Sequence, residues 1–207
     1  MFSKLQYISQ GSTGIAQLNN IRQALEAGCR WIQLRFKNAS DNELNEVAHE
    51  VKKMCTFSGA IFIMNDHPGI AKEVSADGVH LGFTDMSITE AKKIMGNDKI
   101  IGGTANTLKD VLQRVDEECN YIGLGPLRFT KTKDALSPIL GLEGYVKIMK
   151  EMETRGISIP IYAIGGIELY DLPALIKTGV YGIAVSGMIT NHPDKKILLD
   201  QLNAILL

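Results

Sequence analysis

Short apolar runs recur eight times along this chain of 207 residues. They are typical of buried β-strands and lie at residues 5–9, 31–35, 60–64, 78–81, 100–103, 121–124, 159–164 and 182–185. Apolar residues at helical spacing predict amphipathic helices at residues 41–54, 87–95, 107–117, 142–152 and 194–206. This alternation predicts an α/β fold, a single (β/α)8 TIM barrel formed as one domain by residues 1–207. A doubly wound open sheet is the alternative, because strand counting from one sequence does not exclude it.

The charge balance and the cysteines argue against several classes of protein. The 22 basic and 23 acidic residues nearly cancel, so a nucleic-acid footprint or a polybasic membrane patch has no compositional support. Cys29, Cys55 and Cys119 are widely spaced and odd in number, which argues against a disulfide framework and a zinc site. The chain has neither a bilayer-length apolar run nor a signal-peptide core near its start. We therefore expect a soluble, cytoplasmic protein.

Polar and glycine residues follow the apolar runs at the points where these runs end. In a parallel barrel the carboxyl ends of all strands meet on one face, which carries the catalytic groups of barrel enzymes. The residues at these points are Gln33, Arg35, Lys37, Asn65, Asp66, Asp85, Thr130, Thr132, Lys133, Gly165 and Gly166. Carboxylates, cations and glycine amides on one face indicate a site for a divalent metal ion and phosphorylated ligands.

Asp66 and Asp85 follow two consecutive runs and would therefore come from adjacent strand ends. Hard oxygen ligands of this kind suit a shared magnesium ion that retains water and phosphate ligands. Taken alone, Asp66 is equally consistent with an N-cap of the next helix. The position of Asp85 favours the metal site.

Gln33, Arg35 and Lys37 alternate along one strand end and would point to the same side, where the two cations suit a diphosphate. A solvated surface position is the alternative for the lysine. The pair Gly165-Gly166 closes the seventh unit, the usual phosphate position in these barrels, although Gly-Gly is also a common turn.

The histidines form no catalytic constellation. His49, His80 and His192 are most simply interpreted as structural or surface residues, and only His67 lies near the expected site.

These motifs together resemble the thiamine-phosphate synthase family, which also contains the TenI-type thiazole tautomerases. The family pattern Q-x-R-x-K matches residues 33–37, N-D matches 65–66, and H-[IL]-G-x-x-D matches 80–85. The T-x-T-K loop matches residues 130–133 and the I-G-G-I turn matches 164–167. The resemblance extends over nearly the whole chain.

The resemblance implies condensation of hydroxymethylpyrimidine diphosphate with hydroxyethylthiazole phosphate, or its carboxylated form, to give thiamine phosphate and diphosphate. It implies Mg²⁺ on Asp66 and Asp85. Diphosphate binding falls to Arg35, Lys37 and Lys133 as catalytic groups, with Asn65. The remaining substrate-binding residues would be Gln33, Thr104, Thr130, Thr132, Gly166, Ser186 and Gly187. A homo-oligomer is compatible with this assignment.

Some positions depart from the family pattern. Asn106 stands where the family often has a histidine, and Phe83 stands where synthases usually carry glutamine. Arg128-Phe129 replaces an aromatic–proline pair, and Gly187 replaces a serine. That histidine resembles the proton-transfer group of the tautomerases, so its loss favours the synthase. A thiazole phosphate tautomerase and a non-catalytic phosphate-binding barrel are the alternatives.

Overall fold

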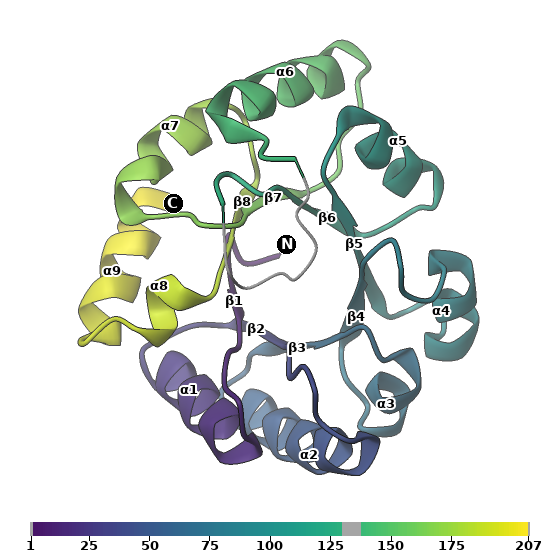
Figure 1. Cartoon of the computed structure of the whole chain (residues 1–207), viewed down its shortest axis with the longest axis vertical. Coiled ribbons are helices and arrows are strands. Elements are labelled where there is room, and N and C mark those ends of the chain that lie inside the picture. The colour runs from purple at the N-terminus through teal and green to yellow at the C-terminus, as the bar shows by residue number, and fades with distance from the viewer. Residues whose placement is uncertain (1, 130–137, 207) are drawn as a thin grey trace.

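The computed structural model describes residues 2–129 and 138–206. Eight parallel strands form a closed barrel in which each strand pairs with its neighbours in sequence (Figure 1). The strands are β1 (Leu5–Ile8), β2 (Trp31–Leu34), β3 (Ile61–Asn65), β4 (Gly78–Leu81), β5 (Ile100–Ala105), β6 (Tyr121–Leu124), β7 (Ile161–Ile164) and β8 (Gly182–Val185). Strand β8 pairs with β1 in the register Leu5–Ile183, which closes the sheet. The predicted (β/α)8 barrel is confirmed, and the open-sheet alternative is wrong.

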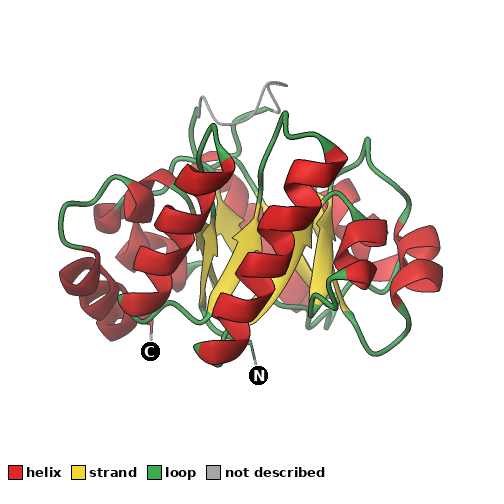
Figure 2. Ribbon diagram, turned by 90° about the horizontal axis from the view of Figure 1, so that it is seen from below, coloured by secondary structure: helices red, strands yellow, loops and turns green. Residues whose placement is uncertain are grey.

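Helices surround the barrel and separate the strands from solvent (Figures 1 and 2). They are α1 (Gly14–Glu26), α2 (Asp41–Phe57), α3 (Pro68–Glu73), α4 (Ile88–Met95), α5 (Leu108–Asp116), α6 (Gly141–Thr154), α7 (Leu172–Lys177), α8 (Gly187–Thr190) and α9 (Lys195–Leu206), with a 3₁₀ turn η1 (Leu169–Asp171) before α7. The five predicted helices form, with ends shifted by at most three residues. In the described part of the chain, no helix is long and apolar enough to cross a membrane.

Helical spacing did not reveal α1, α3, α7 or α8. In α1, Ile15 is 74% exposed whereas Gln17 is only 1% exposed, so apolar and buried positions do not coincide. Helices α3 and α7 have six residues each, fewer than two turns, which is too short to give a periodic signal.

Serine and threonine caps fix where several helices begin. The Ser40 and Ser87 hydroxyls accept hydrogen bonds from the backbone amides of Glu43 and Glu90, at the starts of α2 and α4. These caps give a hydrogen-bond acceptor to amides that have no partner within the helix, and therefore fix the residue at which each helix begins.

An aromatic cluster fills the barrel interior near the strand starts. The rings of Trp31, Tyr121 and Tyr162 meet edge-on, with centroids 5.0 to 5.7 Å apart. Strand alternation then places Gln33 above Trp31, and the same register brings Asn65, His80 and Thr104 into the interior near the opposite end. Apolar packing thus closes one end of the barrel, whereas polar side chains occupy the other.

Candidate functional site

Gln33 and Asn65 form a polar pair at the ends of β2 and β3. Gln33 is 2% exposed, and its Nε2 donates a hydrogen bond to Asn65 Oδ1 at 2.8 Å. Gln33 Oε1 is buried and has no hydrogen-bond partner among the described residues. A buried acceptor without a partner is costly, so this oxygen is suited to receive a hydrogen bond from a bound molecule.

Asp66 lies directly after β3 in an unusual backbone conformation. Its φ is +66°, in the left-handed region that non-glycine residues rarely adopt. The Asp66 amide donates to His80 O of β4 at 3.0 Å, which holds this conformation in place. Backbone strain of this kind persists where the surroundings enforce it, and it is concentrated at functional sites.

Asp85 faces Asp66 across the ends of β3 and β4. The Gly82 amide donates to Asp85 Oδ2 at 2.6 Å and orients this carboxylate. Burial, then a hydrogen bond and charge repulsion from Asp85, raise the pKa of Asp66 to about 7, while Arg35 and Asn65 act in the opposite direction. The two carboxyl groups are therefore close enough to share a proton when no cation separates them.

The helix-cap interpretation of Asp66 is wrong. Helix α3 begins after His67, which is its N-cap residue, and within the described chain no side chain makes the capping hydrogen bond. The left-handed backbone at Asp66 turns its carboxylate toward Asp85 instead of toward the helix start.

The acidic pair is the part of this face that fits a divalent cation. Among residues 2–129 and 138–206, no cluster of three or more His, Cys, Asp or Glu side chains could hold a metal ion. Two carboxylates leave most ligand positions to water and to ligand phosphates, as magnesium prefers. The donor set therefore fits magnesium and does not fit a structural zinc ion.

Arg35 and Lys37 follow the end of β2 and lie near Asp66. Arg35 is half-buried, and its charge favours ionisation of Asp66. Buried Gln17 donates to Arg35 O at 3.1 Å, and the Arg35 amide donates to Ser9 Oγ at 3.0 Å, so the backbone is held from two sides. The position of the arginine is thus fixed by the chain around it.

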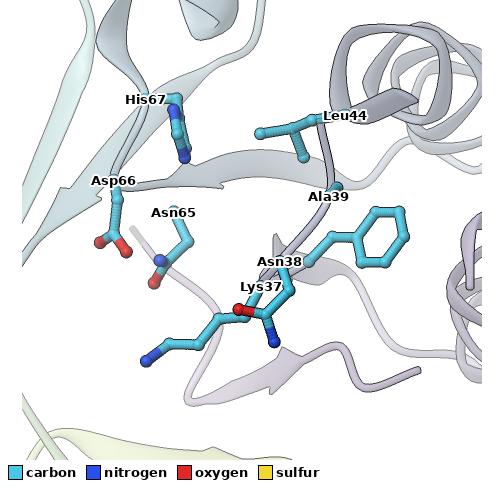
Figure 3. Close-up of a pocket in the computed structure, with 8 residues that line it drawn as sticks. Lys37, Asn38, Ala39, Leu44, Asn65, Asp66 and His67 are labelled. Atoms are coloured by element: carbon cyan, nitrogen blue, oxygen red, sulfur yellow. The ribbon is translucent and has the colours of Figure 1, made fainter. Parts of the chain in front are cut away.

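A pocket of about 310 Å³ opens between the segments after β2 and β3. Figure 3 shows the polar ends of Lys37, Asn65 and Asp66 directed toward a common space within it. Lys37 is exposed, which permits its ammonium group to follow a bound anion. A pocket with an amine, an amide and a carboxylate can hold a metal–diphosphate group.

Thr104 and His80 belong to a hydrogen-bonded chain inside the barrel. Thr104 Oγ1 lies 3.1 Å from His80 Nε2, and His80 Nδ1 lies 3.1 Å from the Tyr121 hydroxyl. Gln6 Nε2 donates to the same hydroxyl at 3.2 Å. The structural interpretation of His80 therefore misses its role in orienting Thr104. Gly123 lies opposite the His80 ring, where a Cβ would be 3.2 Å from His80 Cε1, so glycine leaves room for this ring.

Gly165 and Gly166 form the turn after β7 with φ angles of +92° and +70°. A Cβ on Gly165 would lie 2.5 Å from Pro126 Cβ, and one on Gly166 would lie 2.5 Å from Arg128 Cγ. Glycine is therefore required because the segment after β6 packs directly against this turn.

At the end of β8, the Ser186 side chain is hydrogen-bonded within the protein. The Ser186 hydroxyl donates its proton to Ile8 O at 2.6 Å, so it cannot also donate that proton to a ligand. Gly187 begins α8, and a Cβ there would lie 3.3 Å from Gln10 Nε2 and 3.4 Å from Asn191 Nδ2. Backbone groups and these two amides are the donors that remain here.

Asn106 lies between the ends of two neighbouring strands. Asn106 Nδ2 donates to Gly125 O, and its backbone amide donates to Asp110 Oδ2 at 2.9 Å, so this residue joins the ends of β5 and β6. Thr130, Thr132 and Lys133 lie outside the described residues, and their assignments stay predictions.

Comparisons with known proteins identify the family of this chain. A family model described as thiamine monophosphate synthase matches residues 7–189. A thiamine-phosphate synthase of Flavobacterium psychrophilum is 57% identical over 203 residues, covering 98% of this chain and 98% of the relative. One from Bacteroides fragilis is 50% identical over 190 residues, covering 92% of this chain and 93% of the relative.

Solved structures show the same similarity. The thiamine phosphate pyrophosphorylase from Pyrococcus furiosus superposes with a TM-score of 0.85 and 32% identity, covering 98% of this chain and 95% of that one. A 3-hexulose-6-phosphate synthase has a TM-score of 0.73 at 16% identity, covers 99% of this chain and 100% of that one, and shows the fold alone.

Proposed function

The chain belongs to the thiamine monophosphate synthase family and is a transferase of thiamine biosynthesis, and we propose the following reaction for its site. The reaction joins hydroxymethylpyrimidine diphosphate to hydroxyethylthiazole phosphate and releases thiamine phosphate and diphosphate. With the carboxylated thiazole as substrate, the carboxyl group leaves as carbon dioxide in addition. This proposal is supported by the acidic pair, the neighbouring cations and the glycine turn at one end of the barrel.

The reaction breaks one bond and forms another at a single carbon. The bond between the pyrimidine methylene carbon and the diphosphate oxygen breaks, and its electron pair leaves with diphosphate. The lone pair of the thiazole nitrogen then forms the new carbon–nitrogen bond. No proton leaves the reacting nitrogen, so the step needs no general base. The main requirement is to stabilise the charge that develops on the leaving group.

Asp66 and Asp85 would hold magnesium at the departing diphosphate. Burial and the neighbouring Asp85 raise the pKa of Asp66, so the ionised pair carries negative charge that a divalent cation would neutralise. Bound there, magnesium supplies positive charge beside the diphosphate oxygens. The fixed Gly82 amide keeps Asp85 in position for this role.

Arg35, Lys37 and Asn65 would bind the diphosphate directly. The half-buried Arg35 presents a rigid guanidinium fork, and Lys37 adds a movable ammonium group at the pocket edge. Lys133 is proposed to contribute from the loop after β6.

The barrel interior suits the aminopyrimidine ring. Gln33 Oε1, which has no hydrogen-bond partner among residues 2–129 and 138–206, can accept a hydrogen bond from the ring amine. Thr104 offers a hydroxyl fixed by His80. Held in this way, the methylene carbon would face the incoming thiazole, whose nitrogen needs positioning more than activation.

The thiazole phosphate is proposed to bind beside the glycine turn. Backbone amides around Gly166 and Gly187 are its donors, together with Thr130 and Thr132. Ser186 contributes through its backbone, because its hydroxyl proton is bound to Ile8 O. No observation favours the tautomerase alternative, since the Asn106 carboxamide titrates no proton and joins two strand ends.

The contact between Asp66 and Asp85 is the single observation that carries this proposal. The test measures diphosphate release from the purified protein mixed with both substrates and magnesium, with each component omitted in turn. Release that requires all three, with thiamine phosphate formed in equal amount, is expected. Turnover of the thiazole phosphate without metal would support an isomerase instead, and binding without release would support the binding-only barrel.

A further inference from the structure

Arg128 connects the loop after β6 to the glycine turn after β7. Its backbone amide donates to Gly165 O at 3.1 Å, and its Nη1 donates to Gly166 O at 2.6 Å. Both carbonyl oxygens of the turn are therefore directed toward this one residue. Strands β6 and β7 are neighbours in the barrel, which brings the two segments together (Figure 1).

The directions of the carbonyls fix the directions of the amides. In a trans peptide the carbonyl and the N–H point to opposite sides. The Gly165 carbonyl shares a peptide with the Gly166 amide, and the Gly166 carbonyl shares one with the Ile167 amide. Both amides therefore point away from Arg128. In the described part of the chain, neither amide has a hydrogen-bond acceptor. Successive N–H groups of this kind form a concave anion-binding arrangement.

Asp171 holds the Arg128 side chain in this position. Two parallel hydrogen bonds of 2.6 Å join the guanidinium to the carboxylate, and the Glu168 amide donates to the same carboxylate at 2.7 Å. Burial opposes the ionisation of Asp171, but the hydrogen bonds from Arg128 and Glu168 keep its pKa below the usual range. The Arg128 guanidinium also lies 5.4 Å from the Tyr170 ring centroid. Asp171 and Tyr170 therefore hold Arg128 on one side of the turn, and the Gly166 and Ile167 amides point to the other side.

We propose that Arg128, held by Asp171, is a positioning residue that orients the Gly166 and Ile167 amides toward the phosphate of the thiazole substrate. The inference rests on the proposed function, because it assigns the glycine turn to that phosphate. Arg128 does not touch the phosphate in this arrangement. Its guanidinium is engaged by Gly166 O and Asp171, and its alkyl stem occupies the space beside Gly166 that a side chain would need.

The test compares Arg128→Ala, Arg128→Lys and Asp171→Asn with wild type and with Arg155→Ala. Arg155 is a matched control, because it pairs with Glu151 on the surface of α6, away from the turn. Steady-state kinetics gives kcat and the KM of each substrate. In parallel, calorimetry measures binding of hydroxyethylthiazole phosphate without magnesium or the pyrimidine substrate. A double variant, Arg128→Ala with Asp171→Asn, tests whether the two residues act as one unit.

In Arg128→Ala the KM of the thiazole phosphate should rise about tenfold, while kcat and the KM of the pyrimidine diphosphate change by less than about twofold. Asp171→Asn should reproduce part of this effect although it lies behind the arginine, and the double variant should be no worse than Arg128→Ala. Lysine should restore only part of the loss, since it cannot form two parallel bonds to a carboxylate. Arg155→Ala should resemble wild type.

An unchanged KM of the thiazole phosphate in Arg128→Ala, or an equal rise in both KM values, would overturn the inference while leaving the synthase intact. If wild type binds the thiazole phosphate but forms no product, the synthase proposal is wrong, but the positioning role of Arg128 is not contradicted. Weaker binding in Arg128→Ala would then still support the positioning role.

Discussion

The two sides of the barrel mouth differ in which part of the chain faces the site. At β3 and β4, the carboxylates of Asp66 and Asp85 face each other, and the Gly82 amide holds the Asp85 carboxylate in place. At β6 and β7 the arrangement is reversed, because the Arg128 side chain holds the backbone and the turn presents its amides. The chemistry of the β3–β4 side therefore depends on which residues are present, whereas that of the β6–β7 side depends on how two loops pack together.

The acidic side should show the largest effect of substitution. Asp66→Asn and Asp85→Asn keep the side-chain shape but remove one charge from the metal pair. Each should lower kcat/KM about 100-fold or more, as expected when a metal ligand is lost. The assay is magnesium-dependent diphosphate release, with the exposed Asp116→Asn as the matched control. Full activity in either site variant would refute the metal assignment.

The glycine side should respond through the backbone. Gly166→Ala places a Cβ 2.5 Å from Arg128 Cγ at a residue with φ of +70°, so both a collision and backbone strain result. The free energy of unfolding should fall by about 1–3 kcal/mol, measured by urea denaturation.

Adding Arg128→Ala to Gly166→Ala separates these two causes. The collision disappears with Cγ, whereas the strain of the positive φ remains, so the double variant should recover part of the lost stability. A double variant that is less stable than the sum of the single losses would contradict the packing argument.

The acidic pair also predicts how stability depends on pH in metal-free protein. Burial and Asp85 raise the pKa of Asp66 from its ordinary 3.8 to about 7, so the folded state disfavours the charged form. The stability associated with protonated Asp66 is complete below the unfolded pKa of about 3.9 and is lost as the pH rises through the folded pKa.

Asp66→Asn should therefore gain stability over wild type at high pH only. The expected gain at about pH 8 is about 1–2 kcal/mol, discounted for partial solvent screening, and it should vanish near pH 4. Urea unfolding with a chelator at both pH values measures it. Magnesium should remove the difference by stabilising wild type. An equal difference at both pH values would mean that the ionisation of Asp66 is not the cause.

The smallest effect is expected at Gly187, where the family commonly has serine. A Cβ there meets only the amide ends of Gln10 and Asn191, at 3.3 and 3.4 Å, and these flexible groups can move. Gly187→Ser should change the free energy of unfolding by less than about 0.5 kcal/mol. It should lower the KM of the thiazole phosphate by no more than about threefold. A marked loss of activity would show that the backbone at β8 needs more space than the structure indicates.

Much of the fold could be predicted because strands and long helices are local signals. All strands lie within two residues of the predicted runs, since each is a short buried stretch bounded by polar residues. Helix α1 was missed because Gln17 is buried to bond Gly11 O and Arg35 O, whereas Ile15 faces solvent. Such a reversal depends on contacts between distant residues, which periodicity does not contain.

The candidate site was predictable to the extent that its chemistry lies in side chains. The charges of Arg35, Asp66 and Asp85 at the strand ends indicate a metal and phosphate site through residue type and position alone. His80 was not identified, because its partners Tyr121 and Thr104 lie 41 and 24 residues away in the sequence. The use of the Ser186 hydroxyl by Ile8 O, 178 residues away, was equally inaccessible.

The amino-acid sequence alone is enough to predict the alternating strands and helices, the end of the sheet at which polar residues gather, and the family resemblance. These follow from strand periodicity and residue identity, which every segment carries locally. The folded structure was needed to find that Asp66 turns toward Asp85 and that Arg128 and Asp171 hold the glycine turn. The physical reason is that hydrogen bonds and charge interactions act over a few ångströms in space, and closure of the barrel brings distant segments within that range.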